Sequence, residues 1–235
     1  MNALKAELYK ASTLPAVWAG FALTVVGCIA LEVLLASQGD VTGTDSLPMG
    51  TVGAAVIGVV AFSSEYTANS ADAGGGRQIT TTLTTTPSKT RVLLTKALTI
   101  VILIVLSAVV AMPVAVGIAR PDVPADELLT SCLGATLYWV LSGLLGFAIT
   151  VVLRNGVIPL ILLILNSSLV SVSLLLTKLT SLAYWLPDLA GRRLFGSGVR
   201  TVDSGLDAVP GGLVMAGWAV LLCLLAGFVF ARRDA

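Results

Sequence analysis

The sequence predicts an all-α protein that crosses a membrane several times, and three observations lead to this prediction. The chain of 235 residues is 56% hydrophobic and only 11% charged, whereas about a quarter of the residues of a soluble protein are charged. Six long apolar runs follow one another along the chain, with polar loops between them. Basic residues are concentrated in alternate loops, which is the charge pattern of a polytopic helical membrane protein.

Each apolar run predicts one helix of about the length that crosses roughly 30 Å of hydrocarbon. The expected spans are about residues 14–36, 47–64, 92–118, 128–153, 157–176 and 213–230. The second is short, and it needs the residues just before Met49 to reach across. The fifth consists almost entirely of Leu, Ile and Val, so that its insertion into hydrocarbon is favourable despite one Asn and four Ser. We therefore expect residues 1–235 to form a single transmembrane domain of six helices.

The first residues, Met1–Leu14, predict an amphipathic helix ahead of the first span. Leu4, Leu8 and Ala11 recur at helical spacing and alternate with Lys5 and Lys10. Such a helix lies along the inner membrane surface with its basic face towards the lipid headgroups. The alternative is an ordinary frayed terminus with lysines that reach the headgroups. The stretch lacks the cleavage site of a signal peptide.

The distribution of basic residues predicts the orientation. If the N-terminus is cytoplasmic, six spans return the C-terminus to the cytoplasm. Nine of the Lys and Arg residues are then cytoplasmic and five are external, mostly in one long loop. Cytoplasmic loops of membrane proteins carry the excess of Lys and Arg. Both termini are therefore expected inside the cell.

Two connecting segments are longer than the roughly 12–15 residues beyond which loops are usually functional or disordered. Glu65–Arg91 is cytoplasmic in the predicted layout and joins the second span to the third. Thr177–Gly212 is external and joins the fifth span to the sixth. The external segment is rich in apolar and aromatic residues such as Tyr184 and Trp185. It therefore predicts short helices that partly re-enter the membrane interface.

Composition excludes several kinds of chemistry. The chain has no His, so His-based zinc sites and His-based acid–base catalysis are ruled out. Its three Cys residues stand inside predicted spans, where we interpret them as small buried hydrophobic residues rather than disulfide partners. Gly74–Gly76 lacks the Lys-Ser/Thr that a phosphate-binding loop requires. We expect no catalytic residues, metal, cofactor or nucleic-acid partner for this chain, although its net charge of +1 by itself says nothing about nucleic acid.

A motif follows the second predicted span and begins with the pair Glu65-Tyr66. It continues with Gly76 and Ile79, Thr80–Leu83, Pro87, Lys89, Arg91 and Lys96. Together with the six-span layout, this motif resembles that of the ABC-2-type transporter permeases, the membrane subunits of bacterial ABC exporters. The chain differs from their usual pattern in Thr67–Gly75, which stands between the Glu-Tyr pair and the first basic residue, Arg77.

The resemblance implies a multi-pass protein of the bacterial plasma membrane that forms a path for export. Its implied partners are membrane lipid, a second permease copy, identical or different, and a separate ABC subunit that binds ATP and Mg²⁺. A cytoplasmic element between two spans can serve such a motor as a lever that moves both spans. The cargo indicated by the apolar spans and small external loops is hydrophobic or amphiphilic. The residues expected to couple this chain to the ATPase are Glu65, Tyr66, Arg77, Pro87, Lys89 and Arg91.

Three polar residues inside predicted spans are candidates for the substrate path. Glu32 lies near the outer end of the first span, where the alternative is a charge that reaches the headgroups or pairs with an external Arg. Asn166 and Ser167 lie near the middle of the fifth span, where the alternative is hydrogen bonding between packed helices. Two other functions stay open for the whole chain. One is a non-transporting scaffold or sensor, and the other is an ion-coupled carrier that needs no ATPase.

Overall fold

The computed structural model describes residues 2–39, 45–66, 79, 82, 88–119, 123–167, 172–196 and 206–232. Every regular element within these ranges is a helix. Five helical segments are long and apolar enough to cross a membrane. The chain is therefore an all-α membrane protein, as its composition and apolar runs predicted.

The long helices are α1 (Asn2–Thr13), α2 (Pro15–Ser37), α3 (Gly50–Ser63), α5 (Lys89–Ala119), α6 (Ala125–Leu153), α7 (Val157–Ser167) and α10 (Ala208–Arg232). Single helical turns extend α3 at both ends, namely η1 (Leu47–Met49) and η2 (Ser64–Tyr66). Four short helices lie between α7 and α10: α8 (Val172–Leu176), η4 (Ser181–Trp185), α9 (Pro187–Ala190) and η5 (Gly191–Phe195).

Five of the six predicted spans correspond to one continuous helical segment each, whereas residues 168–171 of the fifth lie outside the described residues. The predicted span 157–176 contains α7, which ends at Ser167, and α8, which begins only at Val172. The 11 residues of α7 extend about 16 Å, half the thickness of a membrane core. A sixth membrane-crossing helix is thus not confirmed.

The centre of the bundle is α3, which packs between α2 and α6. In the most apolar stretches of α3 and of α6, 61% of the residues are buried, against 22% in α2 and in α10, so α3 and α6 form the inner part of the bundle. Small residues permit this position: a Cβ at Gly58 would lie 2.0 Å from the carbonyl oxygen of Gly143 in α6. Small residues of α6 thus let it pack closely against α3. The outer faces of α2 and α10 remain apolar and uncovered, as a lipid-facing surface requires.

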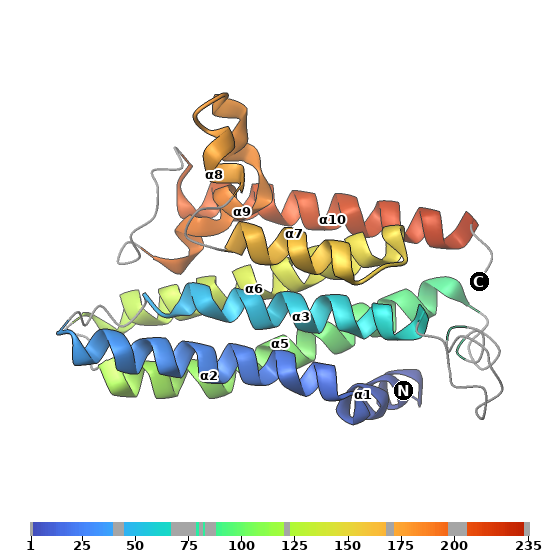
Figure 1. Ribbon diagram of the computed structural model, residues 1–235, viewed down its shortest axis with the longest axis horizontal. Coiled ribbons are helices and arrows are strands. Elements are labelled where there is room, and N and C mark those ends of the chain that lie inside the picture. Colours follow the sequence, from blue (N-terminus) through green and yellow to red (C-terminus); the bar gives the residue numbers. More distant parts are fainter. Residues whose placement is uncertain are drawn as a thin grey trace.

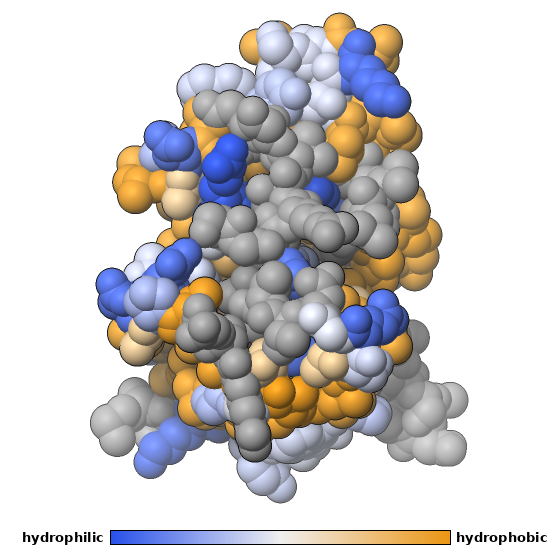
Figure 2. All heavy atoms as spheres, turned by 90° about the vertical axis from the view of Figure 1, so that its left-hand side faces the viewer, coloured by the Kyte–Doolittle hydropathy of each residue, from blue (hydrophilic) through white to orange (hydrophobic). Residues whose placement is uncertain are grey.

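Both chain ends lie at the same end of the bundle, which we call the terminal end (Figure 1). There α1 meets the end of α3 and the start of α5, and Lys89 Nζ lies 3.3 Å from the Ala231 carbonyl oxygen of α10. The opposite end, the far end, carries α8 and α9. Figure 2 looks onto the far end, where hydrophilic residues are scattered over the face and apolar residues lie along the flanks.

Residues 181–196, comprising η4, α9 and η5, pack into the far end and are called the far-end plug. Positions without side chains let the plug approach closely, because a Cβ at Gly134 of α6 would lie 2.0 Å from the Leu194 carbonyl oxygen. A Cβ at Gly211 of α10 would lie 2.1 Å from the carbonyl oxygen of Ala190. The plug therefore lies directly against the backbones of α6 and α10.

Candidate functional site

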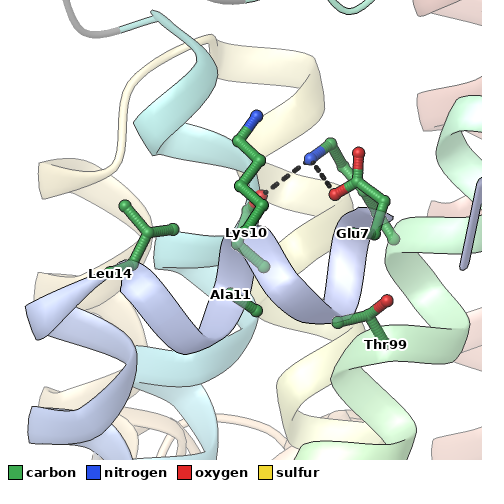
Figure 3. A pocket seen from close by; sticks show the side chains of 7 residues that line it. Glu7, Lys10, Ala11, Leu14 and Thr99 are labelled. Atoms are coloured by element: carbon green, nitrogen blue, oxygen red, sulfur yellow. Dashed lines mark hydrogen bonds and ion pairs between the residues drawn. The ribbon is translucent and has the colours of Figure 1, made fainter. Parts of the chain in front are cut away.

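The helix α1 is held against the bundle by the way in which the chain enters α2. Leu14 is extended and Pro15 begins α2, so the two helices are separate. The indole Nε1 of Trp18 donates to the carbonyl oxygen of Ser12 at 2.7 Å and fixes the angle between them. Ala11 is buried, and Glu7, Lys10 and Ala11 line a small pocket that α1 forms with α3 and α5 (Figure 3). The polar face of α1 thus points into the bundle.

Four charged side chains meet beside this pocket and form what we call the inner charge cluster: Glu7, Lys10, Glu65 and Lys96. The side chains of Glu65 and Lys96 are only 0% and 2% exposed. The Lys96 ammonium lies 2.7 Å from Glu7 Oε2, 2.5 Å from Glu65 Oε1 and 3.4 Å from the Ala61 carbonyl oxygen. An ammonium group has three N–H donors, so these three acceptors satisfy it completely.

The carboxylate of Glu65 is satisfied in the same way by three donors from three parts of the chain. Its Oε1 accepts from Lys10 of α1 and from Lys96 of α5. Its Oε2 accepts from the hydroxyl of Thr82 at 3.1 Å. Thr82 belongs to the segment between α3 and α5 that the sequence predicts to be the coupling segment. Glu65 therefore joins the end of α3 to α1, α5 and this segment at once.

The cluster contains two acids and two bases, so its formal charges cancel. Removing these groups from water costs several kcal/mol per ion, and only well-placed opposite charges and hydrogen bonds offset that cost. An intact buried pair adds little net stability, whereas loss of one partner leaves an uncompensated charge. What the cluster supplies is therefore position: α1, α3 and α5 fit together in the one arrangement that pairs all four charges.

A second contact holds the end of α3 from the other side. The guanidinium of Arg154 lies 5.3 Å from the centre of the Tyr66 ring, within the range of a cation–π interaction. Arg154 ends α6 in the left-handed region, with φ of 53°, a strained conformation that persists where surrounding contacts fix it. Tyr66 also packs on Phe62. The Glu-Tyr pair thus connects α3 to helices on both of its sides.

The other predicted coupling residues are only partly described. Arg77 and Pro87 lie outside the described residues. Lys89 begins α5 and contacts the carbonyl oxygen of Ala231 near the end of α10. Arg91 is exposed at the terminal end. The structure thus brings Glu65 and Tyr66 together with α1, α5 and α6, and leaves Arg91 on the surface.

The predicted path residues lie apart from one another. Glu32 is 1% exposed and faces the interior of the bundle, and its Oε2 has no hydrogen-bond partner among the described residues. Its burial argues against a side chain that reaches the headgroups. Asn166 lies in α7, and α3 stands between α7 and α2 (Figure 1). The side chain of Ser167 lies outside the described part of the chain.

Sequence analysis missed three members of the cluster, Glu7, Lys10 and Lys96, as site residues. It placed the basic face of α1 towards lipid headgroups, yet Lys10 pairs with Glu65. A signal was present, because Lys96 stands inside an apolar run and a charge there requires a partner. Which acid supplies the partner depends on how α1 folds back, and no spacing within the sequence reveals that.

No protein-family model matches the sequence, and no curated protein matches it significantly.

Proposed function

We propose that this chain is the membrane subunit of an ATP-driven exporter of the ABC-2 type, moving a hydrophobic or amphiphilic molecule across the bacterial plasma membrane. A separate subunit supplies ATP hydrolysis, and a second permease copy completes the path. The terminal end faces the cytoplasm, and the charge distribution of the loops supports this orientation.

The observation that carries the proposal is the set of hydrogen bonds to Glu65. This residue ends α3, pairs with Lys10 and Lys96, and accepts from Thr82 of the segment that leads to α5. A force applied to that segment from the cytoplasm reaches α1, α3 and α5 together, because their charges are satisfied only in their joint arrangement. Packed elements moved in this way shift as rigid bodies rather than deform. An external motor needs such a connection.

The far-end plug supports the proposed re-entrant loop. Gly191 of the plug lies against the ring of Tyr138, which is 15 residues, or about 22 Å, from the Leu153 end of α6. A membrane core of about 30 Å that begins near Leu153 therefore includes this level. On this placement the plug occupies the outer third of the membrane and closes the path from outside.

The proposal is tested by purifying the tagged full-length chain from its native host in mild detergent, and by measuring the ATPase activity that accompanies it. We expect a soluble ABC ATPase to copurify in stoichiometric amount. Arg91→Glu reverses an exposed charge at the terminal end and should reduce copurification at least severalfold without reducing the yield of the chain. Lys178→Glu makes the same change in an exposed residue near the far end and should have no effect. Absence of any ATPase from the parent chain contradicts the proposal.

One observation favours the second candidate, an ion-coupled carrier. Glu32 is buried in α2 with an oxygen that no described donor satisfies, and ionisable groups within membrane spans often belong to ion pathways. The carrier requires ion-driven uptake or release in proteoliposomes that contain this chain alone, and loss of that activity in Glu32→Gln. The exporter requires the ATPase subunit in the same assay.

A further inference from the structure

The far-end plug contains a half-buried acid, Asp188, that the proposed function does not use. Asp188 stands in α9, and both of its carboxylate oxygens are shielded from solvent without a hydrogen-bond partner among the described residues. The rest of the plug is well connected. The Tyr138 hydroxyl donates a hydrogen bond to the backbone carbonyl oxygen of Asp188 at 3.1 Å. Nε1 of Trp218 in α10 donates one to the backbone carbonyl oxygen of Trp185 at 2.9 Å. Among the described residues, the Asp188 carboxylate is thus shielded from water and no donor makes a well-formed hydrogen bond to it.

A buried carboxyl without donors is tolerated far better neutral than charged. Burial accordingly raises the pKa of Asp188 above the ordinary value of 3.8, and the Ser173 hydroxyl, the Arg192 guanidinium and nearby backbone amides only partly oppose this. An ionised Asp188 is therefore stabilised if the plug moves outward and the carboxylate reaches water. The closed plug and the ionised acid are mutually unfavourable.

Other titratable groups around α9 do not replace Asp188 in this role. α6 contributes Tyr138, whose hydroxyl is engaged with the plug backbone. On α10 the plug packs near Gly211 and Met215, whereas the titratable residues of that helix, Cys223 and Arg232, come two or more turns later. The helix α8 presents Ser173, which is not ionisable near neutral pH. The other charged or titratable residues of the described surrounding segments are Lys178, Tyr184, Arg192, Arg193 and the exposed Asp207, and, on α6, Cys132 and the residues Asp126 and Glu127 of its exposed first turn. Arg200 and Asp203 lie outside the described residues.

We propose that the far-end plug is a pH-operated latch, closed while the Asp188 carboxyl is protonated and released when that carboxyl is ionised. The sign follows from proton linkage. The closed plug binds the proton more tightly than the open one, so the closed state is favoured at low pH. The free energy that favours the closed plug over the open plug decreases as pH rises above the ordinary carboxyl pKa of 3.8. This decrease ends once pH exceeds the raised pKa of the closed state. This inference concerns the plug itself and holds whichever function the chain has.

The test measures the exposure of a cysteine inside the plug as a function of pH. The full-length chain is placed in lipid nanodiscs with Cys28, Cys132 and Cys223 replaced by Ala, and Ala183→Cys supplies the only thiol. Ala183 is 3% exposed, so a charged maleimide reaches this position only when the plug opens. The rate of labelling is compared between chains with Asp188 and with Asp188→Asn, because this ratio cancels the pH dependence of the thiol.

We expect the ratio of the two labelling rates to rise with pH by up to about tenfold per unit within the window, and then to level off. Asp126→Asn, which neutralises an exposed acid at the start of α6, should leave the curve of the parent unchanged. A ratio that is constant or falls with pH overturns the proposal.

A second reference position keeps the proposal testable if the Asp188→Asn chain does not fold. Leu179→Cys, at a position that is 83% exposed, reports thiol reactivity alone in the chain that keeps Asp188. The rate at position 183 divided by the rate at position 179 should again rise with pH. If this quotient stays flat, the latch does not exist.

Discussion

Two buried carboxylates at opposite ends of the bundle differ in what surrounds them. Glu65 at the terminal end receives hydrogen bonds from Lys10, Lys96 and Thr82. Neither carboxylate oxygen of Asp188 at the far end accepts a well-formed hydrogen bond among the described residues, and the nearby Ser173 hydroxyl and Arg192 guanidinium only partly favour its charged form. The first carboxylate is stable as an anion and holds three helices in one arrangement. The second is stable in place only when neutral. Paired charges thus hold the helices of the terminal end together, whereas ionisation of Asp188 releases the plug at the far end.

The largest effect expected from this comparison is at Lys96. Lys96→Met leaves Glu7 unpaired and Glu65 with one ammonium partner fewer, and loss of one partner of a buried ion pair costs about 3–5 kcal/mol of folding free energy. Thermal unfolding in detergent, followed by circular dichroism, should occur at clearly lower temperature. Lys5→Met, an exposed position of the same α1 helix as Glu7, is the matched control and should unfold with the parent. Equal melting of Lys96→Met and Lys5→Met would break the comparison.

A double-mutant cycle sharpens the description of the cluster as one unit. Glu65→Gln and Lys96→Met remove groups that contact each other, so their effects on unfolding free energy should be non-additive by about 0.5–3 kcal/mol. The double variant should be less destabilised than the sum of the single variants, because neither charge is left alone. The measurement is chemical unfolding of all four chains under one condition. Strict additivity would mean that the two residues act separately.

At the far end, neutralisation should stabilise rather than destabilise. In the parent chain the stability of the plug should fall by up to about 1.4 kcal/mol per pH unit across the window between the open and closed pKa values of Asp188. Asp188→Asn removes this slope and is more stable than the parent above the window. The rate of limited proteolysis within residues 181–196, compared between the parent and Asp188→Asn at several pH values, measures this stability of the plug. Destabilisation of Asp188→Asn at every pH would show that the carboxylate has a partner after all.

The smallest expected effect concerns the second contact at the end of α3. Tyr66→Leu removes the ring face that Arg154 covers, and a cation–π contact of this kind contributes about 0.5–1 kcal/mol when partly exposed. Tyr66→Phe keeps the ring and is the control. The thermal midpoint should fall slightly for Leu and stay unchanged for Phe. If Phe falls as far as Leu, the hydroxyl and not the ring face stabilises this position.

The sequence predicted the elements whose signal is local. Each of the five confirmed spans is a continuous apolar run, and a run of that length is sufficient to specify a helix in a membrane. The run 157–176 is also apolar, but only α7 and α8 of it lie within the described residues, so a sixth span stays a prediction.

The candidate site was less accessible to sequence analysis, because its members come together only through tertiary folding. Glu65 was identified from its position after a span, but its partners are 55 positions away at Lys10 and 31 positions away at Lys96. Asp188 was not singled out, although an acid within an apolar and aromatic stretch is unusual. Whether such an acid reaches water or is buried depends on how far the plug enters between α6 and α10, and the residues of the plug alone do not specify that depth.

The comparison between the two ends is tested most directly by hydrogen–deuterium exchange of the full-length chain in nanodiscs at two pH values, one near the lower limit of the window and one above it. Amide exchange within each peptide is corrected for the intrinsic effect of pH on the chemical rate. We predict that peptides covering residues 2–13, 60–66 and 89–99 keep their protection, whereas those covering residues 181–196 lose protection at the higher pH. Equal protection of the plug at both pH values, or a parallel loss at both ends, would contradict the account.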